Sequence, residues 1–80
     1  MLAAMTIRKL EIWIDKNGLP GLCFSGPDGD GFRYDLEQPA LLAHEFTAGC
    51  HIEAMEIYHK YVGYEKYKSD YPELDSIPYK

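Results

Sequence analysis

The stretch Phe46–Gly63, FTAGCHIEAMEIYHKYVG, decides the fold of this chain. It predicts the end of a strand, a sharp turn and one amphipathic helix from about Cys50 to Val62. Apolar side chains recur along one stripe of that helix, and charged side chains occupy the opposite side. Gly63 follows as the left-handed residue that commonly ends a helix.

The residues before this stretch are typical of an antiparallel sheet. Ile7–Asp15 alternates apolar and polar side chains with the period of a half-buried strand. A three-residue loop with Gly18 in the left-handed region pairs Ile12 with Leu22 in the next strand. This register keeps the large apolar side chains on one face, which a two-residue Asn-Gly turn would not do. Pro20 predicts that the second strand lies at an edge.

The middle of the chain is a glycine-rich loop followed by a segment with an ambiguous pattern. Ser25–Gly31, SGPDGDG, predicts a connecting loop. Phe32–Glu37 alternates like a strand, which we favour, and the alternative is one helical turn capped by Asp30. Leu41–Thr47 predicts the next strand.

Together these patterns predict an α+β fold, in which a small antiparallel sheet of three or four strands carries one amphipathic helix on one face. The length of 80 residues predicts a single domain, residues 1–80, with a flexible start at 1–5 and a Tyr-rich C-terminal tail at 64–80. The tail either covers its own sheet or binds a partner. The expected core consists of Leu10, Ile12, Ile14, Leu22, Phe24, Leu42, Phe46, Ile52, Met55 and Val62.

Composition and charge disfavour several function classes. The net charge is −5, from 13 acidic and 8 basic residues, and the basic residues form no patch of the kind that nucleic-acid binders carry. No stretch approaches the ~20 apolar residues of a membrane span. Two cysteines and the lack of a signal-peptide pattern predict a cytoplasmic protein with reduced thiols. We expect neither a nucleic-acid nor a membrane partner.

Cys50 is the strongest candidate for chemistry, because a thiol at a helix N-terminus has a lowered pKa. His51 follows directly, so a small enzyme or a redox-responsive protein built on this pair is the alternative function. A Cys50-x-x-Glu53 capping box explains the same residues without any activity. His44, His51 and His59 lack the spacing of metal ligands. We therefore expect no enzyme, cofactor or metal site.

Aromatic side chains provide the remaining functional signal. Trp13 faces away from the expected core of its strand, and Tyr64, Tyr67 and Tyr71 crowd the tail. Tyrosine and tryptophan are enriched at protein interfaces. We expect a non-enzymatic protein-interaction module, such as an inhibitor, immunity-type or accessory protein. These four residues would bind another protein or mediate self-association.

A motif in the C-terminal half adds one resemblance. The run F-x-A-x-x-x-x-E-A-M-x-x-Y-H begins at Phe46, and Gly63, Tyr67 and the pair Pro78-Tyr79 follow it. This pattern resembles a group of short uncharacterised bacterial proteins that share a strand, an E-A-M helix and a tail with Tyr and Pro. The resemblance implies a small bacterial cytoplasmic domain, and it implies no activity.

Overall fold

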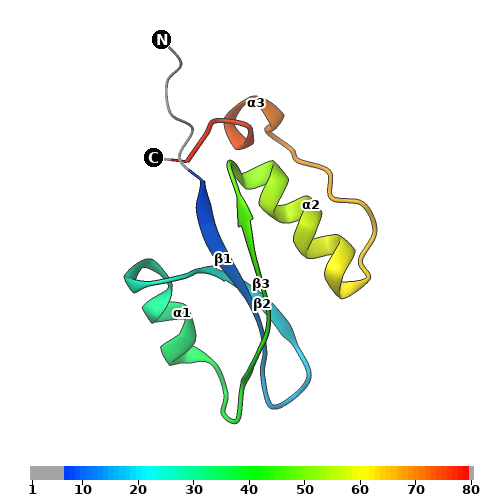
Figure 1. Cartoon of the computed structure of the whole chain (residues 1–80). Helices are drawn as coiled ribbons and strands as arrows, with labels where there is room; N and C mark the ends of the chain where they lie inside the picture. Colours follow the sequence, from blue (N-terminus) through cyan, green and yellow to red (C-terminus); the bar gives the residue numbers. More distant parts are fainter. Residues whose placement is uncertain (1–6, 80) are drawn as a thin grey trace. The chain divides into compact units, whose positions relative to one another are not determined.

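A computed structural model describes residues 7–79 of the chain (Figure 1). The elements are β1 (Arg8–Ile14), β2 (Pro20–Phe24), the 3-10 turn η1 (Pro27–Gly29), α1 (Asp30–Asp35), β3 (Leu41–Ala48), α2 (His51–Val62) and α3 (Pro72–Asp75). The strands form one antiparallel sheet in the order β2-β1-β3. The sheet and helices confirm the α+β class. Residues 1–5, expected to be a flexible start, lie outside the described part.

The hairpin of β1 and β2 adopts the predicted register. Ile12 lies opposite Leu22, and Leu10 lies opposite Phe24. Because side chains alternate along a strand, the large apolar residues of both strands share one face. β2 is an edge strand, as predicted, and it begins at Pro20, which has no N–H to offer a further strand.

A three-residue loop closes this hairpin, also as predicted. The backbone N–H of Asp15 donates to the carbonyl of Leu19 at 3.0 Å, so residues 16–18 form the loop. Gly18 has a φ of 80°, in the left-handed region that glycine adopts at little cost. The carboxylate of Asp15 accepts from the backbone N–H groups of Asn17 (2.8 Å) and Leu19 (3.0 Å). One aspartate therefore fixes the turn.

The preference for a strand over Phe32–Glu37 was wrong, because the helix α1 covers Asp30–Asp35. Pro27 begins the preceding turn η1 with a φ suited to a helix, and α1 continues from it. Asp30 does not cap α1. It is the first helical residue, and its carboxylate accepts from Arg33 at 2.7 Å one turn later. Alternation over so few residues does not distinguish a strand from a single helical turn.

The helix α2 begins and ends where predicted. Cys50 is its N-cap, although the thiol makes no capping hydrogen bond. The carboxylate of Glu53 accepts from the N–H of Gly49 at 2.9 Å, which resembles the acidic half of a capping box shifted by one residue. Gly63 has a φ of 82°, and its N–H donates to the carbonyl of His59. The packing of α2 on a face of the sheet stays a prediction.

After α3 the chain returns to the start of α2 (Figure 1). The N–H of Tyr79 donates to the carbonyl of Gly49 at 2.8 Å. Cys50 and Pro78 form an isolated antiparallel bridge. The Tyr-rich segment thus folds back along the helix that precedes it.

The described residues fall into two compact units. One unit comprises residues 9–46, with the hairpin, α1 and most of β3. The other comprises residues 47–79 together with residues 7–8. The first buries Ile12 (0 % exposed), and the second buries Ala48 (1 %) and Ala54 (0 %).

Of the ten residues expected in the core, only Leu10 and Ile12 are buried. Leu42 is 42 % exposed, because it lies near the start of the edge strand β3, so its assignment to the core was wrong. On α2 the buried side chains are Ala54 and Tyr58, whereas Met55 is half-buried. The hydroxyl of Tyr58 lowers its apparent hydropathy, but its ring carries a large apolar area. Leu10 is buried as expected. The other expected core residues, Ile14, Leu22, Phe24, Phe46, Ile52 and Val62, are half-buried.

Candidate functional site

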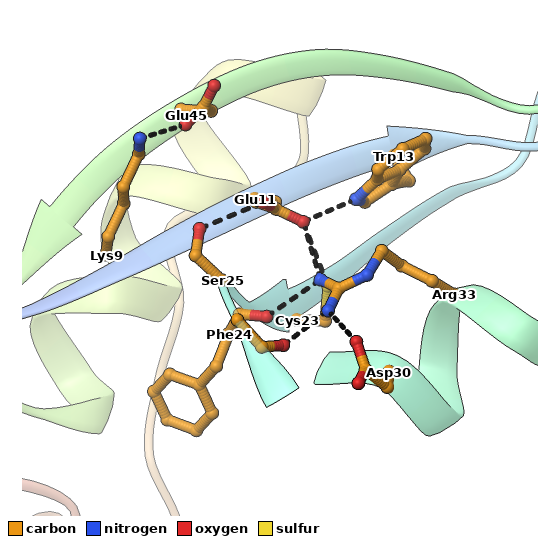
Figure 2. A network of polar contacts seen from close by, with 10 residues as sticks. Lys9, Glu11, Trp13, Cys23, Phe24, Ser25, Asp30, Arg33 and Glu45 are labelled. Carbon is orange, nitrogen blue, oxygen red and sulfur yellow. Dashed lines mark hydrogen bonds and ion pairs between the residues drawn. The ribbon is translucent and has the colours of Figure 1, made fainter. Parts of the chain in front are cut away.

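A polar cluster gathers on the face of the hairpin that lies away from its apolar side chains (Figure 2). The carboxylate of Glu11, on β1, accepts from Trp13 Nε1 at 2.9 Å and from Ser25 Oγ at 3.0 Å. It also accepts from Arg33 Nη1 at 2.8 Å, and the side chains of Glu11 and Arg33 are 14 % and 22 % exposed. The ion pair is therefore largely withdrawn from water and stabilised by neutral donors as well.

The guanidinium of Arg33 is as fully engaged as its carboxylate partner. Nη1 also donates to the carbonyl of Phe24 at 3.1 Å. Nη2 donates to the carbonyl of Gly26 and to the carboxylate of Asp30. Since each terminal nitrogen has two N–H groups, the protein itself occupies these donors. Arg33 joins η1 and α1 to the hairpin, which is a structural role.

Two glycines allow α1 and η1 to approach the hairpin closely. A Cβ on Gly29 would lie 2.0 Å from the carbonyl oxygen of Phe24, and a Cβ on Gly21 would lie 2.3 Å from the ring of Phe32. Gly21 lies opposite Trp13 in the ladder between β1 and β2. The segment with α1 therefore lies over the strand face that carries Trp13, a cover that the sequence did not indicate.

Electrostatics hold this cluster in one protonation state at neutral pH. Burial acts to raise the pKa of Glu11, but the indole, hydroxyl and guanidinium donors outweigh it, and the pKa lies below its ordinary value. Cys23 Sγ lies 3.8 Å from Glu11 Oε1 and 3.6 Å from Arg33 Nη1. Burial, and then the charge of Glu11, raise the pKa of the Cys23 thiol. The cluster thus contains a carboxylate and a neutral thiol, unlike an activated nucleophile.

A second cluster joins histidine and tyrosine rings of α2 and the segment that follows it. His59 meets Tyr64 and Tyr67 edge to face, with ring centroids 5.4 Å and 5.2 Å apart. His59 Nδ1 lies 2.8 Å from the carbonyl oxygen of Glu65. His51 meets Tyr67 at 6.1 Å, also edge to face. These contacts hold the chain beyond the helix against the helix itself.

The four residues expected to bind a partner have different surroundings. Trp13 is half-buried and donates to Glu11 in the polar cluster. Tyr67 is half-buried beside the histidine rings, whereas Tyr64 and Tyr71 are 52 % and 67 % exposed. The structure brings Tyr64 and Tyr67 together around one histidine. Of the four, only Tyr64 and Tyr71 are more than half exposed.

Cys50 and His51 stand at the start of α2. The ring of His51 lies against Tyr67, and no hydrogen bond among the described residues joins it to Cys50. Within residues 7–79, no group of His, Cys, Asp and Glu side chains is placed to hold a metal ion. No helix in that range is long and apolar enough to cross a membrane.

The link between Glu11 and Arg33 is the feature that sequence reasoning missed. The two residues are 22 positions apart, so no local pattern connects them. One signal was present, because Arg33 is the only lysine or arginine between Lys16 and Lys60. A lone cation in an acidic stretch is a candidate for a buried ion pair.

Comparisons with protein-family models, with curated proteins and with solved structures found no match to this chain. The motif that begins at Phe46 therefore assigns no family. The contacts and the exposure of the described residues remain as the basis for a functional inference.

Proposed function

We propose that this protein is a non-enzymatic protein-interaction module that binds its partner through the segment after α2. One observation carries the proposal, namely the large apolar side chains that this segment exposes. They are Tyr64 (52 % exposed), Tyr71 (67 %), Leu74 (64 %) and Ile77 (54 %). Large apolar side chains grouped on a surface are typical of interaction sites, and tyrosine is enriched there.

Hydrogen bonds order this segment before any partner binds. The carboxylate of Asp75 accepts from the hydroxyl of Tyr67 at 3.3 Å and from the hydroxyl of Ser69. The N–H of Tyr71 donates to Ser69 Oγ at 3.0 Å. A segment held in one conformation loses less entropy on binding, which favours affinity. In this proposal Tyr67 positions the segment, and Tyr71 is a contact residue.

In this proposal the polar cluster has a structural role. Both terminal nitrogens of Arg33 donate to groups of the protein, and the raised pKa of Cys23 keeps its thiol protonated at neutral pH. Neither side chain offers a nucleophile or an anion site. Trp13 takes part in the same cluster through its ring N–H, so we assign it no direct contact with the partner.

The test compares surface variants in direct binding. The partner is captured from an extract of the native cells, purified, and titrated calorimetrically with the wild-type chain and with Tyr71→Ala and Leu74→Ala. Each variant is expected to weaken binding about tenfold or more, as truncation of an interface anchor does. Tyr34→Ala is the matched control, because Tyr34 is 89 % exposed and lies on α1.

Two results would contradict the proposal. One is equal binding by the wild-type chain, Tyr71→Ala and Leu74→Ala. The other is a thiol of Cys50 that reacts with iodoacetamide much faster than a model peptide thiol, with loss of biological activity in Cys50→Ser. That second result would favour the alternative function based on Cys50 and His51.

A further inference from the structure

Carboxylates accompany the exposed apolar side chains of the segment after α2. Residues 71–77 expose three of these apolar side chains, namely Tyr71 (67 %), Leu74 (64 %) and Ile77 (54 %). Residues 69–79 contain three acidic side chains and no lysine or arginine, and the acids are Asp70, Glu73 and Asp75. Each of the exposed apolar residues therefore lies within two positions of a carboxylate.

The same stretch provides no positive charge to offset these carboxylates. Asp75 accepts hydrogen bonds from the hydroxyls of Tyr67 and Ser69, which are neutral donors. Asp70 and Glu73 are exposed. Burial is the largest cause that raises the pKa of the Tyr67 hydroxyl, and the charges of Asp75 and Asp70 raise this pKa further. The segment thus combines exposed apolar area with a negative potential.

We propose that this segment binds a basic protein surface, on which lysine or arginine side chains surround an apolar pocket. The inference rests on the proposed function and adds the chemistry of the partner. Tyr71 and Leu74 enter the pocket, whereas Asp70 and Glu73 pair with the cations around it. An apolar centre with a charged rim is the common arrangement of a protein interface, and complementary charge in the rim selects the partner.

The charge of the segment disfavours other occupants. A symmetric dimer through this segment would bring two copies of the same carboxylates together, on chains that each carry a net charge of −5. The anionic lipids of a membrane surface and the phosphates of a nucleic acid would be repelled in the same way. A basic protein surface is the occupant whose charge complements this segment.

Selection from a displayed library of random peptides tests the chemistry of the partner. The wild-type chain is the bait, and peptides that also bind Tyr71→Ala are discarded. We expect the remaining peptides to combine a large apolar residue with lysine or arginine, at about twice the basic content of the unselected library or more. Their content of aspartate and glutamate is expected to fall.

Charge variants test the carboxylates with the tightest selected peptide, by fluorescence anisotropy. Glu73→Lys is expected to weaken binding about fivefold or more, and Asp70→Asn, which keeps the side-chain shape, about two- to threefold. Glu56→Lys is the matched control, because it makes the same change in net charge at an exposed position of α2. It is expected to change the affinity less than about twofold. For the wild-type chain, an increase from about 0.05 M to about 0.5 M NaCl is expected to weaken binding about fivefold or more.

The outcomes separate this inference from the proposed function. Peptides that depend on Tyr71 but show no excess of lysine and arginine would overturn the inference and leave the proposed function intact. Equal effects of Glu73→Lys and Glu56→Lys would also overturn it, because overall charge would then explain the result. A library that yields no peptide dependent on Tyr71 would contradict both proposals.

Two further measurements check the other occupants. Sedimentation velocity that detects a dimer of the wild-type chain, lost in Tyr71→Ala, would make a second copy the occupant. Binding to vesicles of phosphatidylserine by the wild-type chain, lost in Tyr71→Ala, would make a membrane surface the occupant. Either result would overturn the inference, and we expect neither.

Discussion

The hydrogen bonds of one side chain, Glu11, show how this small protein holds a charged group in a largely buried position. The carboxylate of Glu11 accepts from an indole N–H, a hydroxyl and a guanidinium, so three donors of the protein stabilise its charge. Removal of one partner from such a group leaves the other unpaired, which costs more than the net gain from the pair. The cluster therefore makes the fold sensitive to acid, which is measurable.

The variant Glu11→Gln tests this sensitivity. The pKa of Glu11 in the folded protein lies below its ordinary value of 4.5, so its contribution to stability is full above that pH and is lost as the pH falls through the lowered pKa. We expect Glu11→Gln to be less stable than the wild type at pH 7. We also expect it to lose less free energy of unfolding between about pH 5 and pH 3. Urea unfolding at several pH values measures both, and identical pH slopes would contradict the assignment.

Ile12 provides the corresponding test of the apolar face. Its side chain is 0 % exposed, so truncation leaves a cavity. We expect Ile12→Ala to lower the free energy of unfolding by about 2–5 kcal/mol. Leu19→Ala, at an exposed loop position, should change it by less than about 0.5 kcal/mol. Similar urea midpoints for the two variants would show that Ile12 is not core.

At the scale of elements, the hairpin was predictable and α1 was not. The hairpin follows from local rules, because Gly18 adopts a positive φ and Pro20 avoids a central strand. The helix α1 depends on a contact between Arg33 and Glu11, which are distant in sequence. For the same reason the polar cluster could not be predicted, whereas composition alone marked the tail as Tyr-rich and left the exposure of Tyr71 open.

A pair of glycine variants tests the close approach of α1 to the hairpin. A Cβ at Gly29 would lie 2.0 Å from the backbone oxygen of Phe24. Because a backbone atom cannot easily move to remove this clash, Gly29→Ala should destabilise the fold. A Cβ at Gly31 would meet nothing within 4 Å. Gly31→Ala should therefore stabilise the fold by up to about 1 kcal/mol, as alanine favours a helix over glycine. Thermal unfolding measures both, and shifts of the same sign would refute this description of the site.

At the scale of the whole molecule, the chain forms two units, and the unit that contains α2 is closed by the return of the chain to the start of that helix. The bridge between Cys50 and Pro78 and the hydrogen bond from Tyr79 to Gly49 close this return. The sequence pattern predicted the bounds of α2. The tail at 64–80 has no periodicity, so only its composition was informative. Tyr58, which is buried on α2, was not among the residues expected in the core.

Deletion of residues 78–80 tests whether this return orders the segment after α2. Without the hydrogen bond of Tyr79 and the bridge of Pro78, we expect faster amide exchange across residues 71–76, because opening of this segment no longer breaks those contacts. The amides of β1 and β2 should retain their protection. Unchanged exchange in residues 71–76 would show that the aromatic contacts alone order the segment.

The close fit of Arg33 has a consequence for recognising relatives of this chain. Loss of either Arg33 or its carboxylate partner Glu11 leaves the other side chain unpaired in a largely buried position, so we expect the two residues to change together among relatives. Gly29 would be retained wherever the arginine is. A Cβ at this position would clash with the carbonyl oxygen of Phe24, to which Arg33 donates. We therefore expect relatives with this arrangement to carry one glutamate on the first strand and a Gly-Asp-x-x-Arg run after the hairpin.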